Sequence, residues 1–217
     1  MPLVTGEIYH VVNRGVGGIP IFKEKKDYQR FLKTLLYYQR QTVPFRFSRF
    51  LTLPKEEQEK ILLENKKVLV EIISYCLMPN HFHFLLKQTV DEGILRFLRL
   101  ATNSYSRFFN LKYKRNGALF GARFKATRIE SEEQLLHVSR YIHLNPYSGF
   151  LVKDLKNLFT YHYSSLPEYL NLSPESYCQK EIITAYFKNP ANYRKFISNQ
   201  ADYQRSLDLI KHKTLEK

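Results

Sequence analysis

Hydrophobic and polar residues alternate along some parts of this chain and recur at helical spacing along others. Alternating β-branched and aromatic residues predict strands, and apolar residues three and four apart predict helices. The predicted strands span residues 7–15, 68–78, 81–89 and 125–131, and the first of them runs into a turn. The predicted helices span residues 26–41, 52–67, 92–113 and 131–145. Ser131 and Gln134 suit the start of the last helix, and Pro146 is expected to end it.

The order of these elements predicts an α+β fold. Without the charged excursion at about 44–67, the order is β-α-β-β-α-β, with the second α element at 92–113 and an extra helix at 131–145. This is the ferredoxin-like pattern, an antiparallel sheet with helices on one face. The other face is then free for a site. We expect one domain over residues 1–150, followed by a mostly helical extension over residues 151–217.

Two histidines lie in the strand predicted at 81–89. Residues two apart in a strand share a face, so His81 and His83 point the same way, about 6.5–7 Å apart. Phe82 and Phe84 then face a core. Imidazoles at this spacing can bind one metal ion, but they can equally be polar residues on a solvated sheet face. His10 has no such neighbour along its strand and, like His143, is expected to be an ordinary structural residue.

The helix predicted at 131–145 carries a polar stripe. His137, Tyr141 and Asn145 are four residues apart, which places them on one helical face. A tyrosine can act as a covalent nucleophile. The chain has 16 tyrosines, however, and most of them must be structural, so the residue types alone leave both roles open for Tyr141.

The charge of the chain favours an anionic partner. The formal net charge is +14, from 34 Lys and Arg against 20 Asp and Glu. Nucleic acid is the usual partner of such a protein, and a membrane surface is the other candidate. No run of 18 apolar residues predicts a membrane span, and the N-terminus does not look like a signal peptide. Two cysteines far apart, Cys76 and Cys178, suit a reducing compartment, so we expect a cytoplasmic protein.

One segment combines many cations with aromatic rings. Single-strand grooves use cations for phosphates and rings for base stacking, although a solvated loop with a few core aromatics has the same composition. The candidate DNA-binding residues in this segment are Lys112, Lys114, Arg115, Phe120, Arg123, Phe124, Lys125 and Arg128. Arg14, after the first strand, is a second candidate for a phosphate contact.

Several of these motifs together resemble a known family. The stretches "YHVVNRG", "MPNHFHFLL", "RFKATRIESEEQLLHVSRYIHLNP" and "YHYSSLPEYL" follow one another in this order. They are similar to the single-tyrosine HUH-superfamily transposases, in particular the REP-associated tyrosine transposases and their relatives. The resemblance covers roughly residues 5–170 and makes the domain at 1–150 a transposase-like catalytic domain.

The resemblance implies a site and a reaction. His81 and His83 would bind a divalent metal, Mg or Mn, with Asn145 as the expected third ligand and His137 as the second choice. Tyr141 would attack single-stranded or hairpin DNA, leaving a 5′-phosphotyrosine and a free 3′-OH, so that the strand can be cut and rejoined.

The sequence leaves two other functions open. One is a non-catalytic, domesticated protein that recognises hairpin DNA or RNA. The other is a metallohydrolase of small phosphate esters, which the long basic segment disfavours because a small substrate needs no groove. The sequence also leaves open whether the protein is a monomer or a homodimer.

Overall fold

The computed structural model describes residues 2–206 except 122 and 175. In chain order the elements of the N-terminal half are β1 (Ile8–Arg14), a 3₁₀ turn (Val16–Gly18), α1 (Lys25–Tyr38), α2 (Phe47–Phe50), α3 (Lys55–Glu64), β2 (Val70–Met78), β3 (His81–Gln88) and α4 (Gly93–Lys112). They are followed by β4 (Lys125–Arg128), α5 (Glu132–Ser148), α6 (Leu155–Phe159), α7 (Leu166–Tyr169), α8 (Glu181–Thr184) and α9 (Pro190–Ser198).

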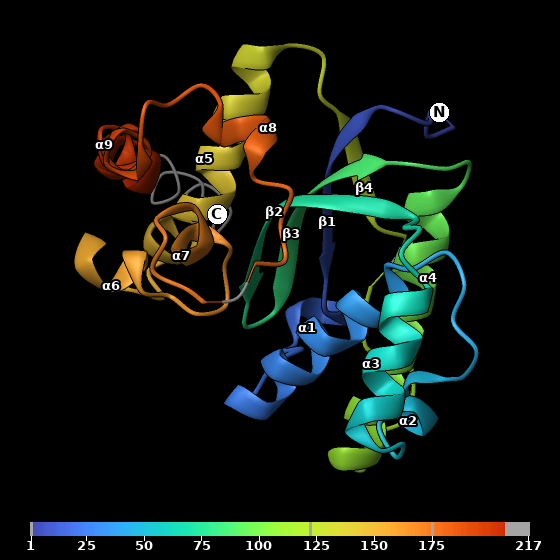
Figure 1. The fold of residues 1–217 in the computed structure, drawn as a ribbon. Coiled ribbons are helices and arrows are strands. Elements are labelled where there is room, and N and C mark those ends of the chain that lie inside the picture. Colours follow the sequence, from blue (N-terminus) through green and yellow to red (C-terminus); the bar gives the residue numbers. More distant parts are fainter. Residues whose placement is uncertain (1, 122, 175, 207–217) are drawn as a thin grey trace.

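The four strands form one antiparallel sheet in the order β2-β3-β1-β4. This order and the β-α-β-β-α-β sequence of the sheet and its two helices, α1 and α4, confirm the predicted ferredoxin-like α+β fold. Because α1 and α4 pack on one face of the sheet, the extra helix α5 has the other face to itself (Figure 1).

The strand register decides which residues share each face. On the face toward α1 and α4, Val11 lies opposite Phe84, and Phe82 packs against Phe31 with ring centroids 5.5 Å apart. On the other face Val12 lies opposite His83 and Arg14 opposite His81. Helix α5 covers this second face over β2 and β3. It therefore packs beside the histidines and leaves β1 and the edge strand β4 less covered.

Asp27 joins the two helices on the first face. Its fully buried carboxylate accepts hydrogen bonds from Lys112, from the Tyr113 hydroxyl at 2.7 Å and from the backbone N–H of Lys23 at 2.9 Å. Burial alone would raise the pKa of Asp27, but these hydrogen bonds outweigh burial and hold the pKa below its ordinary value. The carboxylate thus fastens the start of α1 to the end of α4.

The predicted start of α5 is confirmed, but its predicted end is not. The Ser131 side chain accepts from the Gln134 N–H at 3.1 Å, and the Gln134 side chain accepts from the Glu130 N–H, so the predicted cap is confirmed. The predicted end at Pro146 is wrong, because the helix continues to Ser148. A proline near the end of a helix removes only one N–H, and the Gly149 N–H bonds the Asn145 carbonyl at 2.8 Å to close the last turn.

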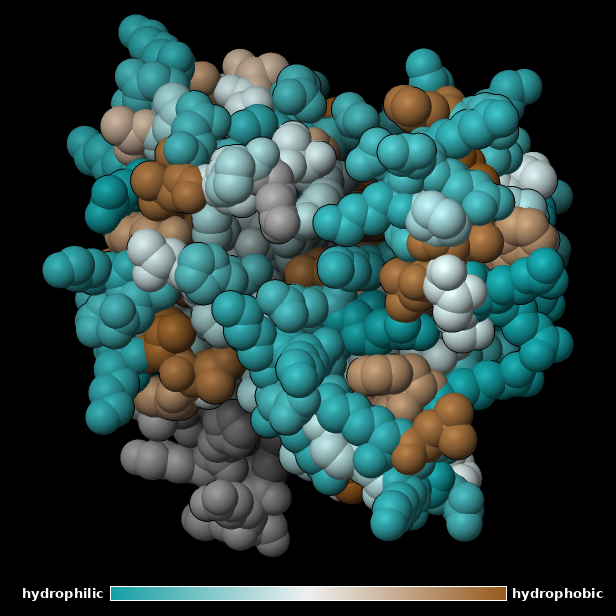
Figure 2. All heavy atoms as spheres, turned by 60° about the horizontal axis from the view of Figure 1, so that its bottom comes forward, coloured by the Kyte–Doolittle hydropathy of each residue, from teal (hydrophilic) through white to brown (hydrophobic). Residues whose placement is uncertain are grey.

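The remaining helices lie outside the sheet. Helices α2 and α3 make up the excursion at 44–67, and α6, α8 and α9 pack against α5 (Figure 1). The division into residues 1–150 and 151–217 stays a prediction, and residues 207–217 of the expected extension lie outside the described part. No helix in the described part of the chain is long and apolar enough to cross a bilayer. On the face shown in Figure 2, hydrophilic residues predominate and hydrophobic ones form small separate patches.

Candidate active site

Strand β3 places His81 and His83 as their spacing predicted. Their ring centroids lie 5.0 Å apart, on the sheet face that α5 covers. Phe82 and Phe84, between and after them, point to the opposite face and are fully buried. The apolar residues of this strand therefore anchor it in the core, while its two imidazoles stay together at one site.

His10 joins this pair, although we expected it to be an ordinary structural residue. Its Nε2 lies 3.0 Å from Nδ1 of His83, and the two rings stack with centroids 5.2 Å apart. That expectation was wrong because it considered each strand alone. Antiparallel pairing puts Val12 opposite His83, so His10, one position further along the same face, reaches the same ring. The sequence signal is the alternation in both strands, "H-x-V" in β1 and "H-F-H" in β3, which puts residues two apart on one face. It indicates a contact only once the register between β1 and β3 is known.

Helix α5 brings Tyr141 and Asn145 to the histidines. The Tyr141 ring meets His83 and His10 edge-on, with centroid distances of 5.5 and 5.9 Å. The Asn145 side-chain amide donates to the Tyr141 carbonyl at 2.9 Å, and its side chain also hydrogen-bonds His81. The nucleophile and the third ligand that the sequence indicated thus lie together with both histidines.

His137, the second choice for a ligand, is held elsewhere. Its Nδ1 accepts from the Arg140 guanidinium at 2.8 Å, and its Nε2 faces Glu133 at 3.7 Å. Arg140 is itself buried against the Phe196 ring, 4.3 Å from the ring centroid. His137 is exposed to solvent, and among the described contacts none joins it to His81 or His83. This geometry favours Asn145 as the third ligand.

Burial keeps the three clustered histidines neutral. It lowers the pKa of His10 to about 4. Burial first and then the charge of Arg14 lower the pKa of His81 to about 4, while the hydrogen bond with Asn145 acts in the opposite direction. The pKa of His83 falls well below its ordinary value, through burial first and then through His81, His10 and Arg14. Neutral imidazole is the form that binds a metal ion.

The donor set fits a divalent metal. Nδ1 of His81 lies 2.6 Å from the Asn80 amide oxygen, which can only accept, so in the neutral ring Nδ1 carries the proton and the lone pair is on Nε2. The His10 contact does the same for His83 if Nδ1 of His83 is the donor. Among the residues that the structure describes, no three His, Cys, Asp or Glu side chains form a metal-binding group. Two Nε2 atoms and the Asn145 amide oxygen would therefore hold the ion and leave positions open for substrate.

Two cations, Arg14 of β1 and Lys125 of β4, lie on the same sheet face as this cluster. Arg14 lies opposite His81 in the sheet, and its charge acts on both His81 and His83. Lys125 lies opposite Val12, which in turn lies opposite His83, so Lys125 faces the same side two strands away, roughly 10 Å from His83. Both residues were predicted phosphate contacts, and the structure places both beside the candidate site.

Four of the other predicted DNA-binding residues have structural partners. Lys112 pairs with the buried Asp27 and with Glu24 at 2.7 Å. The Arg115 guanidinium braces its own loop by donating to the Ala118 carbonyl at 2.7 Å. Arg128 pairs with Glu7 at 2.7 Å. Phe120 is only 8% exposed and packs against Phe31 and Phe82. A basic or aromatic composition cannot distinguish such residues from free ones.

The remaining three predicted DNA-binding residues lie nearer solvent. Lys114 and Arg123 are exposed, and Phe124 is half-buried. Arg123 and Phe124 line a cleft on the sheet face opposite the histidines.

Comparisons with known proteins show which family the chain resembles. The family model described as "Transposase IS200 like" matches residues 45–145, a stretch that contains His81, His83 and Tyr141. None of the curated proteins matches the chain. A solved structure described as "Structure of the REP associates tyrosine transposase bound to a REP hairpin" matches with a TM-score of 0.53 and 14% identity, covering 81% of this chain and 93% of that one. At that identity the match shows the fold alone. In its sequence over residues 45–145 and in its fold, this chain is thus similar to the IS200-like transposases, as its motifs predicted.

Proposed function

We propose that this protein cleaves and rejoins single-stranded or hairpin DNA in a metal-dependent reaction with Tyr141 as the nucleophile. The observation that carries the proposal is the convergence of Tyr141 on His83, with ring centroids 5.5 Å apart. The Tyr141 ring meets two imidazoles edge-on, those of His83 and His10, which is more than the packing of α5 requires. The family match and the fold support a transposase-like enzyme.

The reaction would be a transfer of one phosphodiester bond. The Tyr141 oxygen forms a bond to phosphorus, the bond from phosphorus to the 3′ oxygen breaks, and the 3′ oxygen takes up a proton. The enzyme then carries a 5′-phosphotyrosine, and attack by a 3′-OH reverses the step. Because one phosphodiester replaces another, rejoining requires no ATP.

The residues around Tyr141 have separate roles in this reaction. Arg14 and Lys125 would hold the phosphodiester, and their charge favours the loss of the phenolic proton. His81, His83 and Asn145 would hold the divalent metal, Mg or Mn, which supplies polarisation of the scissile phosphate when it is bound. Asn145 also holds the Tyr141 backbone, because its amide bonds the Tyr141 carbonyl.

Hairpin DNA is the substrate we favour. The solved structure with the same fold is described as bound to a REP hairpin, and the formal charge of +14 suits a nucleic acid partner. In-line attack at a phosphodiester also needs a bent, accessible backbone, which single strands and hairpin junctions supply at little energetic cost.

The test is a covalent adduct. We expect wild-type protein with Mn²⁺ and a labelled hairpin carrying a 5′ tail to give a shifted protein–DNA band on a denaturing gel. Tyr141→Phe should abolish this band while binding persists, because the ring is enough for packing. Tyr203→Phe, at a tyrosine that is 63% exposed, is the matched control and should keep the band.

His81→Ala and His83→Ala should each lose metal-dependent cleavage. His81→Ala should melt close to wild type in chelator, whereas His83→Ala should melt lower because the His83 ring is buried. An adduct that survives in Tyr141→Phe would contradict the assignment and point to another tyrosine. Tight hairpin binding without any adduct in wild type would favour the non-catalytic, domesticated binding protein instead.

A further inference from the structure

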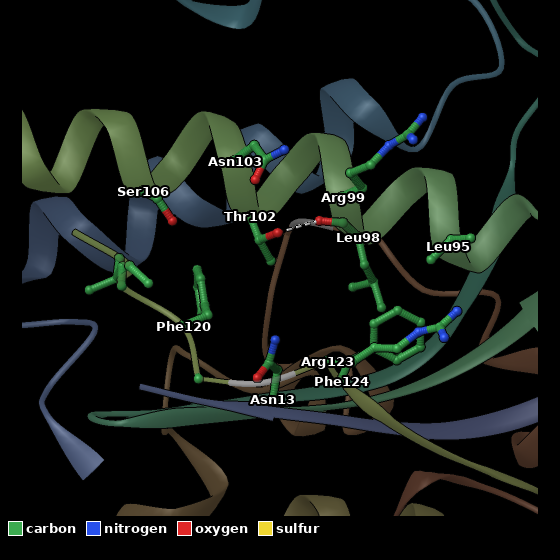
Figure 3. A pocket seen from close by; sticks show the side chains of 13 residues that line it. Asn13, Leu95, Leu98, Arg99, Thr102, Asn103, Ser106, Phe120, Arg123 and Phe124 are labelled. Carbon is green, nitrogen blue, oxygen red and sulfur yellow. Dashed lines mark hydrogen bonds between the residues drawn. The ribbon is translucent and has the colours of Figure 1, made fainter. Parts of the chain in front are cut away.

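A cleft lies on the sheet face opposite the histidines, between α4 and the segment that leads into β4. It has a volume of about 440 Å³. Figure 3 shows Arg99, Thr102, Asn103 and Ser106 of α4 on one side, with Asn13, Phe120, Arg123 and Phe124 on the other. The volume lies within the range of about 300–1,000 Å³ that is usual for small-ligand sites.

We propose that this cleft binds one unpaired nucleobase of the DNA strand whose phosphodiester lies at Tyr141. The inference rests on the proposed function, and it assigns a second contact to the same substrate. The half-buried ring of Phe124 offers a stacking surface, and the buried Phe120 also lines the cleft. Arg99 and Arg123 are exposed and line the cleft, where they would meet the phosphates on either side of the base.

The polar side chains of the cleft have unused hydrogen-bonding capacity. The Asn13 oxygen accepts from the Arg14 N–H at 2.8 Å, which leaves both N–H groups of its amide. The Thr102 hydroxyl donates to the Leu98 carbonyl at 2.7 Å and keeps its lone pairs. Within the described part of the chain, the side chains of Asn103 and Ser106 have no hydrogen-bond partner. Donors and acceptors thus line the cleft together, as recognition of a base edge requires.

The charge around the cleft favours a nucleotide over other planar ligands. The sequence has no Asp or Glu from residue 93 to residue 129, a stretch that supplies all of α4, the following loop and β4. All the cleft residues except Asn13 come from this stretch. Among the described residues, the lining of the cleft therefore carries cations and no carboxylate, which suits a strand of phosphates.

Strand β1 connects the cleft with the candidate active site. Asn13 and Arg14 are neighbours in β1, so their side chains point to opposite faces of the sheet. Asn13 lines the cleft, and Arg14 lies opposite His81. The two sites are consequently back to back, one sheet apart. Since β4 is an edge strand, DNA can pass around it, past Arg123 at the cleft and Lys125 on the side of the histidines.

The experiment locates one base. We would prepare a set of 5′-tailed hairpins with an abasic residue at each tail position in turn, and measure their affinity by fluorescence anisotropy with Tyr141→Phe protein. We expect one tail position at which loss of the base weakens binding roughly 5- to 150-fold, the range for stacking of a single base. Phe124→Leu and Asn103→Ala should each weaken binding of the intact tail and shrink the abasic effect at that position alone.

Controls separate folding, binding and catalysis. Asn116→Ala, an exposed loop amide outside the cleft, should leave the abasic profile unchanged. Asn103 is exposed, so its variant should fold even if the loss of the Phe124 ring lowers stability. The proposal is overturned if no tail position stands out, or if both variants keep the full abasic effect. The covalent adduct is read separately in proteins that retain Tyr141, so a missing adduct refutes the proposed function and leaves the cleft result standing.

Discussion

Replacement of His10 tests whether the candidate metal site depends on a residue that the sequence did not single out. In the structure His10 Nε2 lies 3.0 Å from His83 Nδ1. If the His83 Nδ1–H donates to His10, the lone pair of His83 is on Nε2, where a metal needs it. His10 is then a positioning residue, which fixes the tautomer and the ring orientation of His83.

The expected size of the effect follows from the burial of His83. Its side chain is 5% exposed, so His10→Ala leaves the Nδ1–H with no partner or forces the other tautomer. A buried donor left unsatisfied costs about 1–3 kcal/mol. Loss of such an outer partner of a metal ligand typically weakens metal affinity about 10- to 100-fold, or roughly 1.4–2.8 kcal/mol, which agrees.

The assay is a calorimetric titration with Mn²⁺ at neutral pH, alongside a melt in chelator. His10→Ala should bind Mn²⁺ about 10- to 100-fold more weakly, and His10→Gln should recover part of the affinity because its amide oxygen can accept the same hydrogen bond. His137→Ala is the matched control and should bind as wild type does, since His137 contacts Arg140 and Glu133 instead. Unchanged affinity in His10→Ala, or an equal loss in His137→Ala, would refute the reasoning.

Three further predictions concern stability, charge and pH. Lys112→Met should lower the free energy of unfolding by about 1–3 kcal/mol, because buried Asp27 loses one charged partner but keeps Tyr113 and backbone donors. Lys114→Met should leave the melting temperature unchanged. Because the exposed Lys114 is a predicted phosphate contact, its loss should also flatten the slope of log affinity against log salt by about 0.7. A stable Lys112→Met protein together with a destabilised Lys114→Met protein would contradict both assignments. Burial lowers the pKa of His143 to about 3, so the unfolded chain takes up a proton below about pH 6.5 that the folded chain does not, and stability falls with acid. In urea unfolding with chelator between pH 5 and 6, His143→Gln should reduce this dependence by up to about 1.4 kcal/mol per pH unit, and an unchanged slope would show that His143 is protonated in the folded state.

The sequence predicted what depends on local patterns. Alternation and helical spacing identified the four strands and the helices of the core, since burial of one face imposes a period on each element. The same spacing put His81 and His83 on one strand face and Tyr141 and Asn145 on one helix face, but the resemblance to the transposases was needed to suggest their roles. Their order along the chain was then enough to indicate a shared fold and site.

What the sequence missed depends on contacts between distant segments. His10 reaches His83 only through the β1–β3 register, which no residue pattern within either strand specifies. Lys112 looked like a phosphate contact because its partner, Asp27, lies 85 residues earlier in the chain. Pro146 misled because the rule against proline applies to the interior of a helix, whereas Pro146 stands close to its last turn.

The position of Tyr141 itself depends on residues beyond the stretch that matches the family. His143, two residues along α5, is fully buried, with Nδ1 2.8 Å from the Tyr193 hydroxyl and Nε2 2.7 Å from the Ser165 hydroxyl. The same Tyr193 hydroxyl lies 2.9 Å from Ser139, one helical turn before His143. A buried polar network of this kind is costly to break. Rotation of α5 that moved Tyr141 away from the histidines would also part His143 from Tyr193 and Ser165. Ser165 and Tyr193, both after residue 150, therefore help to hold Tyr141 in place, and a chain cut at residue 150 would lose both partners of His143.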